Sequence, residues 1–375
     1  MRTLFWVSVS LIMGAYAAYP IALYVRAQLW PRRIRLGKIF PQVSIVIAVH
    51  NEGNNLPSKL SNLSALDYPA HLLEVIAVSD GSTDATNEIL ARWENCKQRS
   101  FLLSECGGKA NALNLGIANA KGEIVVFTDA RQMIASDALK NLVAHFADPS
   151  VGCVSGELMI REGPHSSSAY GVGIYWQLEK QIRYWEGLVG STVGATGAFY
   201  AVRRHLLSPV PRETILDDVY IPLQVIRQGK RVVFERRALA WDDLVPSPKQ
   251  ELRRKIRTLI GNYQLLRLTP WVVTGSNPVR FQFLCHKLLR LVVPFALLGL
   301  FVSTLWLREG IYEGVLVFQL FFYALAILSA FRVQVGIVSR LSNISLAFLV
   351  LNSAAAIALV YFITGKKDIW SRRTT

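Results

Sequence analysis

The stretch Glu123-Ile-Val-Val-Phe-Thr-Asp129 decides how this chain folds. Its residues 124–127 are all apolar, which is typical of a parallel strand that is covered on both faces of a sheet. An acidic residue, Asp129, follows at the point where such a strand leaves the sheet. Open α/β sheets bind their ligands beyond the carboxyl ends of the strands, so Asp129 is predicted to lie in a binding site.

Apolar runs alternate with helical patterns on both sides of this stretch. The predicted strands are 43–49, 74–78, 101–103 and 123–127, and the helices between them are 56–66, 85–93 and 109–120. The pattern loosens after residue 151, where strands 151–158, 199–202 and 231–234 and helices 170–188 and 219–227 are predicted. This alternation predicts an α/β fold with a mostly parallel sheet and helices on both of its faces.

The composition indicates a membrane protein rather than a nucleic-acid-binding one. Of the 375 residues 52% are hydrophobic, and 41 Lys and Arg against 26 Asp and Glu give a formal charge of +15. Such an excess suits nucleic acid, anionic lipid headgroups or phosphorylated substrates. The sequence has neither zinc-finger spacing nor an aromatic-basic RNA signature, so no nucleic-acid partner is expected. The four cysteines include no CxxC pair and predict neither a disulfide framework nor a zinc site.

Four apolar segments flank the α/β pattern, and each is a candidate membrane helix. They are residues 3–25, 291–307, 314–331 and 341–365, of which the second and third are near the short end for spanning. Ala15-Tyr16-Ala17 resembles a signal cleavage site, but the apolar run continues past it to Val25, which favours an anchor. Basic residues between 26 and 38 follow the first segment, so the next domain is expected on the cytoplasmic side.

Five units are therefore expected along the chain. They are an N-terminal transmembrane helix at 1–27, a cytoplasmic domain at 38–245, an amphipathic interface region at 246–280, transmembrane segments at 281–365 and a basic tail at 366–375. Helix 249–267 has one apolar face and a basic first half, which is typical of a helix along lipid headgroups. Four spans would leave the tail outside, whereas its basic composition predicts the inside. A re-entrant or interfacial segment, such as 291–307, would remove this conflict.

Six motifs identify the family that this pattern resembles. The first four are Ala48-Val-His-Asn-Glu52, Val78-Ser-Asp-Gly-Ser-Thr-Asp84, Gly107-Gly-Lys-Ala-Asn-Ala-Leu-Asn114 and Phe127-Thr-Asp129. In order and spacing they resemble the donor-binding half of family 2 glycosyltransferases. Leu216-Asp-Asp218 and Arg254-Lys-Ile-Arg257 resemble the acceptor half of the membrane-bound polysaccharide synthases in that family. The resemblance covers about residues 41–260. It implies a GT-A fold in an integral membrane protein, with a bacterial inner membrane as the expected location.

The resemblance implies a UDP-sugar site at the ends of the early strands. Asp80 takes the position that accepts a hydrogen bond from the uracil N3–H, and its neighbour Gly81 allows a tight turn. An ordinary strand-to-helix turn is the other interpretation of this motif. Lys109 opens a helix and could hold a phosphate, although a solvent-facing lysine fits the sequence equally well. The remaining residues expected to line the nucleotide pocket are His50, Asn51 and Glu52.

A divalent metal, Mg²⁺ or Mn²⁺, is the cofactor that the resemblance implies, because charge builds up on the departing diphosphate. The family typically has Asp-x-Asp at this place, whereas this chain has Asp129-Ala-Arg131. One interpretation makes Asp129 the metal ligand, with phosphate and water completing the shell. The other pairs Arg131 itself with the diphosphate. Asp129 as the metal ligand is the preferred hypothesis.

The acidic pair Asp217 and Asp218 matches the family's catalytic carboxylates, with Asp218 at the position of the base. An acceptor hydroxyl needs a base to take its proton, and two adjacent carboxylates raise one another's pKa. One of the pair could instead cap the helix that follows. A single base and direct displacement imply inversion at the anomeric carbon.

The acceptor side is predicted from one loop and one helix. Thr196 and Gly197 resemble the loop that contacts the acceptor sugar, and Arg254 and Arg257 lie where the family has Gln-x-x-Arg-Trp. Arg257 keeps the arginine that could clamp the diphosphate. Thr258 replaces the tryptophan that stacks on the acceptor sugar in processive synthases, which leaves processivity open. A further aromatic group could stack on sugars or belong to the core: Tyr175, Trp176, Tyr184 and Trp185.

Together these features predict inverting transfer of a sugar from a UDP-sugar to a growing polysaccharide or lipid-linked glycan at a membrane. Single-sugar transfer to a polyprenyl-phosphate-type lipid is the alternative. A non-catalytic membrane protein that binds nucleotide sugar or glycan would explain the incomplete Asp-x-Asp, but such a protein needs no base at position 218. A transporter is not expected with so few apolar segments.

Overall fold

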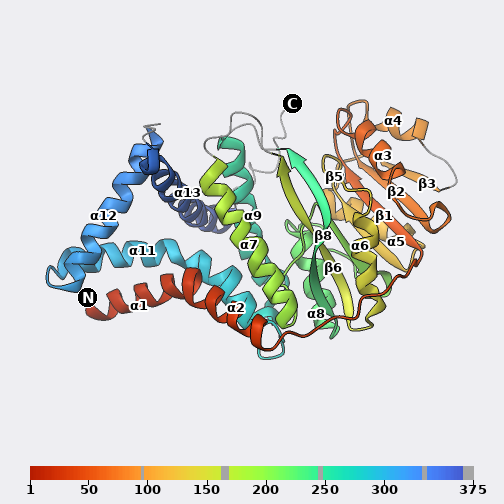
Figure 1. The fold of residues 1–375 in the computed structure, drawn as a ribbon. Helices are drawn as coiled ribbons and strands as arrows, with labels where there is room; N and C mark the ends of the chain where they lie inside the picture. The colour runs from red at the N-terminus through yellow and green to blue at the C-terminus, as the bar shows by residue number, and fades with distance from the viewer. Residues whose placement is uncertain (94–96, 162–168, 244–247, 332–335, 366–375) are drawn as a thin grey trace.

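The computed structural model describes residues 1–93, 97–161, 169–243, 248–331 and 336–365. An eight-stranded sheet with helices on both faces lies at one end of the molecule and apolar helices lie at the other (Figure 1). The strands are β1 (Val43–Val49), β2 (Leu73–Asp80), β3 (Gln98–Leu103), β4 (Ile124–Thr128), β5 (Met133–Ile134), β6 (Val151–Arg161), β7 (Phe199–Arg203) and β8 (Arg231–Asp243). Their order across the sheet is β3-β2-β1-β4-β7-β6-β8-β5, so the predicted α/β fold is confirmed.

Most helices begin and end within a few residues of the predicted positions. Those of the sheet domain are α3 (Leu56–Ser64), α4 (Thr86–Trp93), α5 (Lys109–Asn119), α6 (Ala138–Val143), α7 (Ala169–Val189), α8 (Asp217–Arg227) and α9 (Pro248–Leu268). The apolar ones are α1 (Arg2–Met13), α2 (Tyr19–Leu29), α10 (Arg280–Gln282), α11 (Leu289–Trp306), α12 (Ile311–Ala330) and α13 (Gly336–Thr364). Two π-helical segments, η1 (Gly14–Ala18) and η6 (Phe283–Leu288), join α1 to α2 and α10 to α11. Short 3-10 turns are η2 (Ala70–Leu72), η3 (Ala144–Ala147), η4 (Arg204–Leu206) and η5 (Pro270–Val273).

The sheet is parallel where the nucleotide motifs lie and mixed beyond them. β1 pairs in parallel with β2 on one side and with β4 on the other, and β2 pairs in parallel with β3. In the second half β4 with β7, β7 with β6, and β8 with β5 are antiparallel, while β6 with β8 is parallel. The chain leaves β1 toward β2 and returns to β4 on the opposite side of β1. The loops after β1 and β4 therefore diverge and open a crevice.

Two hydrophobic cores cover the two faces of the sheet. One contains buried residues of α5, α8, α9 and α13, and the other contains buried residues of α3, α4 and α6. All five residues of β4 are buried, which explains why its sequence shows no apolar–polar alternation. Each buried Val, Leu, Ile or Phe side chain contributes about 1.5–3 kcal/mol relative to exposure, so these strands hold the crevice on a rigid base.

Within the described residues, four helices are long and apolar enough to cross a membrane: Arg2–Leu29, Arg280–Trp306, Ile311–Ala330 and Val338–Thr364. The predicted number of segments is confirmed. The second one differs from the prediction because it begins at Arg280 and has 27 residues, which removes the shortness that suggested a re-entrant segment. The N-terminal helix and α11 lie side by side (Figure 1).

Helices α7 and α9 stand between the sheet and the apolar helices (Figure 1). α7 contacts α2 and α13, and α9 contacts α13. The buried face of α9 includes Ile256, Ile260 and Leu265, which belong to the same core as Ala354 and Ala358 of α13. The helix predicted at 249–267 is therefore present, and its apolar face packs on protein. Its role along lipid headgroups stays a prediction, and the tail 366–375 lies outside the described residues.

Candidate active site

The loop that follows β1 is tied to the loop that follows β2. Asn51 has a backbone φ of 54°, in the left-handed region that Asn tolerates better than most other residues. Its side-chain Oδ1 accepts a hydrogen bond from the backbone amide of Thr83 at 2.8 Å. Its own backbone amide donates to Ser82 Oγ at 3.1 Å. His50 Nδ1 lies 2.6 Å from the carbonyl oxygen of Asp80. These bonds join the first two predicted nucleotide motifs into one edge.

Asp80 fixes the glycine loop that precedes α5. Its carboxylate accepts hydrogen bonds from the amides of Gly107 and Gly108, each at 2.8 Å, and from Sγ of Cys106 at 3.3 Å. Gly81 has φ +62°, and a Cβ there would lie 2.5 Å from the Cys106 amide nitrogen, so the tight turn requires glycine. A carboxylate offers about four lone-pair positions, so Asp80 retains room for one more donor, such as a nucleobase imide N–H.

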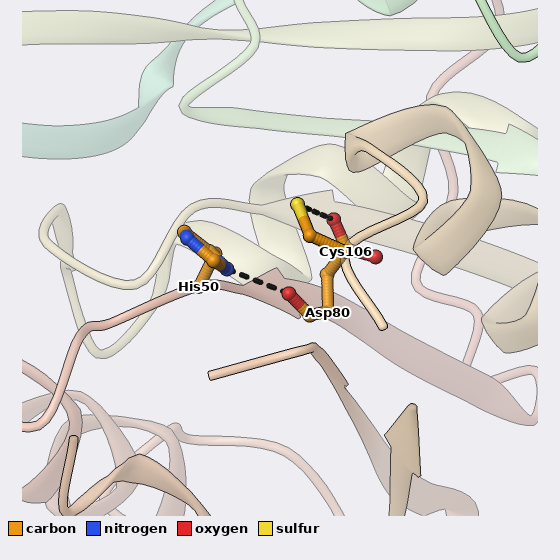
Figure 2. Close-up of side chains that lie close together, drawn as sticks. All are labelled: His50, Asp80 and Cys106. Atoms are coloured by element: carbon orange, nitrogen blue, oxygen red, sulfur yellow. Dashed lines mark hydrogen bonds between the residues drawn. The ribbon is translucent and has the colours of Figure 1, made fainter. Parts of the chain in front are cut away.

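His50, Asp80 and Cys106 form a small cluster whose potential metal-ligating atoms all lie within 4.8 Å of one another (Figure 2). The sequence spacing gave no sign of it, because β1, β2 and the glycine loop supply one residue each. Burial and the hydrogen bond to Asp80 raise the pKa of the Cys106 thiol. Metals bind the thiolate, so the cluster fits an anchor for the glycine loop better than a metal site.

Lys109, at the start of α5, joins two of the predicted acidic motifs. Its Nζ lies 3.0 Å from Asp129 Oδ1 and 3.3 Å from Asp217 Oδ1. Burial alone would lower the pKa of Lys109, but the charges of Asp129 and Asp217 outweigh it and raise the pKa. The lysine is therefore a permanent cation between the end of β4 and the start of α8. It is not the solvent-facing side chain that the sequence allowed.

Asp218 lies next to this ion-pair chain. Its Oδ2 accepts a hydrogen bond from the Gly197 amide at 3.2 Å, and a Cβ at Gly197 would lie 3.0 Å from that same oxygen. Burial and the neighbouring charge of Asp217 raise the pKa of Asp218 to about 6, against the opposing effects of Lys109, Arg183 and Lys287. A carboxylate with this pKa is ionised at neutral pH and has gained basicity, as proton abstraction requires.

A buried lysine that was not among the predicted site residues stabilises the loop around Asp129. Lys59 of α3 is fully buried, and its Nζ donates to Thr128 Oγ1 at 2.8 Å and to the Gln132 carbonyl at 2.6 Å. Burial lowers the pKa of Lys59 to about 7, and only the charge of Asp129 opposes this shift. A signal was available. Lys59 interrupts the apolar stripe Leu56, Leu60 and Leu63 of its helix.

Arg131 pairs with a carboxylate that the sequence analysis did not single out. Its guanidinium lies 3.0 Å from Asp242 Oδ2, at the end of β8, and Gln132 Nε2 donates to the same oxygen at 2.9 Å. Asp242 is buried, so the charge of Arg131 balances a carboxylate that has little contact with water. This pairing leaves Arg131 less available for a diphosphate than the sequence suggested.

A cavity of about 300 Å³ runs from the end of β4 to the apolar helices. Six of the predicted site residues line it: Asp129, Arg131, Thr196, Gly197, Asp218 and Arg254. Lys109 and Asp217 contact the site through their ion pairs. Four residues that were predicted to bind the nucleotide lie outside the cavity lining: His50, Asn51, Glu52 and Asp80. Arg257 is exposed and is not among the lining residues, so its role as a diphosphate clamp stays a prediction.

Trp176 is the member of the predicted aromatic group that lines the cavity. Trp185 stacks edge-on with Tyr24 at 5.2 Å, and Tyr184 lies under the Arg236 guanidinium at 3.7 Å, so both contact other parts of the protein. The side chain of Tyr175 lies outside the described residues. Trp176 also packs against the hydrophobic core, so it combines the two predicted locations of the aromatic group.

The sheet domain has the GT-A architecture, and apolar helices lie at both ends of the chain. Residues 44–209 match the family model described as glycosyl transferase family 2. The poly-beta-1,6-N-acetyl-D-glucosamine synthase of Staphylococcus aureus (strain MSSA476) is 28% identical over 230 residues, which cover 60% of this chain and 55% of that synthase. The synthase of Staphylococcus epidermidis is 27% identical over 251 residues, which cover 65% of this chain and 60% of that synthase. The chain thus spans little more than half the length of these relatives.

A solved structure shares the fold over nearly the whole chain. It is the mannosyltransferase PcManGT from Pyrobaculum calidifontis in complex with GDP-Man and Mn²⁺, with a TM-score of 0.72 and 23% sequence identity. The match covers 97% of this chain and 100% of that one, so it extends beyond the sheet domain to the apolar helices.

Proposed function

We propose that this chain transfers a sugar, with inversion at the anomeric carbon, from a UDP-sugar to a growing polysaccharide or lipid-linked glycan. The observation that carries the proposal is the ion-pair chain in which Lys109 joins Asp129 to Asp217, beside the partly buried Asp218. This arrangement supports a site in which the diphosphate of the donor lies next to the base that deprotonates the acceptor. The synthases among the relatives support a polysaccharide product.

In the proposed reaction Asp218 takes the proton of the acceptor hydroxyl as that oxygen attacks the anomeric carbon. The bond from the anomeric carbon to the diphosphate breaks at the same time, and UDP leaves. The Gly197 amide holds one oxygen of Asp218, which fixes the direction of the other. Lys109 stays positively charged throughout the reaction, because Asp129 and Asp217 raise its pKa. Its charge offsets the negative charges of these two carboxylates.

The donor end of the cavity fits a divalent metal. Asp129 supplies a carboxylate that is partly exposed toward the cavity, and Mg²⁺ and Mn²⁺ favour oxygen ligands. Such ions are commonly held by one or two carboxylates together with substrate phosphates, so a single aspartate is sufficient. When bound, the ion would neutralise charge on the departing diphosphate. Mn²⁺ in the structurally similar mannosyltransferase supports this assignment.

The sheet domain is proposed to lie on the cytoplasmic side of a membrane, where nucleotide sugars are available. Basic residues that follow the first apolar helix support this orientation. The cavity contains side chains of the apolar helices, including Tyr16 and Asn352, so an acceptor could enter from the lipid side. This feature keeps single-sugar transfer to a lipid acceptor as a second candidate, which product length on a gel would separate from chain extension.

A panel of nucleotide sugars tests the proposal. The purified protein with Mn²⁺ is expected to release UDP from at least one UDP-sugar, because the site contains a base that a binding protein does not need. UDP release should be measured for UDP-GlcNAc, UDP-glucose and UDP-galactose, with GDP-mannose as the comparison nucleotide. Release of GDP alone would overturn the UDP assignment, and binding without release from any donor would show a non-catalytic protein.

The pH profile reports on Asp218. Because its pKa is raised to about 6 and the ionised form is the base, kcat/KM is expected to fall about tenfold per pH unit below pH 6 and to level off above it. The Asp217→Asn variant removes a charge that raises this pKa, so its inflection should move to lower pH. The measurement is kcat/KM between pH 4.5 and 8. An inflection that stays in place in the variant would contradict the assignment.

A further inference from the structure

The membrane end of the cavity contains charged side chains that the proposed chemistry does not use. Its lining includes Glu179 and Arg183 of α7 together with His286, Lys287 and Arg290 from the helix Arg280–Trp306. Charged residues in apolar helices are costly and face cavities or partners. Two of them, His286 and Lys287, lie in the π-helical segment η6, and such irregular turns are frequent at functional sites.

Two carboxylates and a histidine form the fixed part of this cluster. His286 Nε2 lies 2.8 Å from Glu179 Oε1, and its Nδ1 lies 2.9 Å from Glu186 Oε1. The Arg290 guanidinium donates to Glu179 Oε2 at 2.7 Å, and Tyr19 donates to Glu186. Burial alone would raise the pKa of Glu179, but His286 and Arg290 outweigh it and hold this pKa well below its usual range.

Three cations adjoin the Glu179–His286–Glu186 unit. Arg183 and Arg290 both lie within ion-pair distance of Glu179, at 3.6 and 2.7 Å, and Lys287 lies close enough to interact with all of these charges. Arg254 and Lys255 line the same cavity from α9. This end of the cavity is therefore rich in cations.

Lys287 has no ion pair or hydrogen bond within the described parts of the chain, although it lines the cavity. Glu179 and Glu186 act on it only at longer range, and Arg183 and Arg290 repel it. A sheltered ammonium without a partner in the protein is costly, which favours an anion as its ligand. The neighbouring Arg183 already donates to Thr196 Oγ1 at 3.0 Å, in the predicted acceptor loop.

The position of these cations in the fold indicates which kind of anion binds there. This end of the cavity lies between α7 and apolar helices, and basic pockets between membrane helices are typical sites for lipid phosphate groups. Both Arg183 and Lys287 act electrostatically on Asp218, so a molecule held there reaches the proposed base. Two cations that line the cavity, Lys287 and Arg183, suit the one or two negative charges of a phosphate or diphosphate.

We propose that the acceptor is a sugar linked through phosphate to a lipid, with the phosphate held by Lys287 and Arg183 and a sugar hydroxyl beside Asp218. This inference rests on the proposed function and names its acceptor class. The acceptor oxygen forms a bond to the anomeric carbon, the bond to the donor diphosphate breaks, Asp218 takes the hydroxyl proton and UDP leaves. The phosphate of the acceptor does not react. It serves only to bind the acceptor to the protein.

Three acceptor probes separate the parts of this claim. Farnesyl-diphosphoryl-N-acetylglucosamine carries both lipid and phosphate, octyl N-acetylglucosaminide carries lipid alone, and N-acetylglucosamine 1-phosphate carries phosphate alone. With the donor found in the nucleotide-sugar panel, the purified full chain in detergent is expected to show a KM for the first probe at least tenfold below that of the other two. Equal KM values for the first two probes would overturn the phosphate site. Equal KM values for the first and third probes would show that the lipid is not part of the recognised acceptor.

Variants of Lys287 test the site itself. Lys287→Gln is expected to raise the KM for the diphosphoryl lipid about 10- to 100-fold, the range for losing one charge-assisted contact. Its KM for the donor and for the neutral glycolipid should stay within twofold. Lys287→Arg should recover most of the loss, which a purely structural role does not predict. Arg280→Gln removes an exposed positive charge from the same helix and should change nothing. An unchanged KM in Lys287→Gln overturns the proposal.

A measurement on the unaltered chain covers the case in which the variants do not fold. Farnesyl phosphate has the phosphate and the lipid but no sugar hydroxyl, so it should inhibit transfer in competition with the acceptor, whereas farnesol should not. Absence of inhibition overturns the site. The two failures remain distinct. No nucleotide release from any donor defeats the proposed function, while efficient transfer to neutral acceptors defeats only this inference.

Discussion

Asp218→Asn is expected to lower kcat for sugar transfer about 10²- to 10⁴-fold, the usual contribution of a positioned general base. The amide is nearly the same shape as the carboxylate and can still accept the hydrogen bond from the Gly197 amide, so the loop should keep its position. It cannot take a proton from the acceptor hydroxyl. The dissociation constant of UDP should change little, because the proposed nucleotide-binding residues Asn51 and Asp80 lie on other loops.

The measurements are single-turnover transfer and UDP binding by calorimetry. Glu213→Gln is the matched control, since it neutralises an exposed carboxylate a few residues earlier and should leave both quantities unchanged. Asp217→Asn is an informative comparison because Asp217 pairs with Lys109 and lies next to the base. Turnover of Asp218→Asn at the level of the unaltered protein would refute its role as base.

Removal of divalent metal is expected to reduce transfer about 100-fold or more, and added Mn²⁺ or Mg²⁺ should restore it. A metal on the diphosphate supplies several kcal/mol of charge stabilisation, and each 1.36 kcal/mol corresponds to a factor of ten. Asp129→Asn should have a similar effect, because the donor end of the cavity then loses its proposed metal ligand. Transfer should be assayed in EDTA and then with excess metal added back.

Arg131→Gln separates the two interpretations of the incomplete Asp-x-Asp motif. Arg131 lies 3.0 Å from Asp242, so its charge is already balanced by a carboxylate. The variant should therefore retain metal-dependent transfer with a smaller loss than Asp129→Asn. Full activity in EDTA together with a severe loss in Arg131→Gln would show that the arginine, and not a metal, neutralises the diphosphate.

Local sequence patterns were enough to predict much of the fold. β1 was predicted at its observed bounds, and α3, α4 and α5 were predicted within a few residues, because strand and helix periodicity is a property of neighbouring residues. β5 has only two residues, too few for a period to appear. The antiparallel return of β7 beside β4 has no local signal, since the direction of a strand depends on the path of the whole chain.

The sequence was enough to predict which residues form the proposed donor site. Motif order predicted that His50, Asp80 and Asp129 lie together at one edge of the sheet, because the ends of neighbouring parallel strands share an edge. Tertiary structure alone decided how the other charges meet. Lys59 supports the Asp129 loop, Asp242 pairs with Arg131, and Lys287 enters the cavity from a membrane helix. The first two contacts join segments about 70 and 110 residues apart. No local pattern encodes them, because helix packing against the sheet sets which distant side chains lie together.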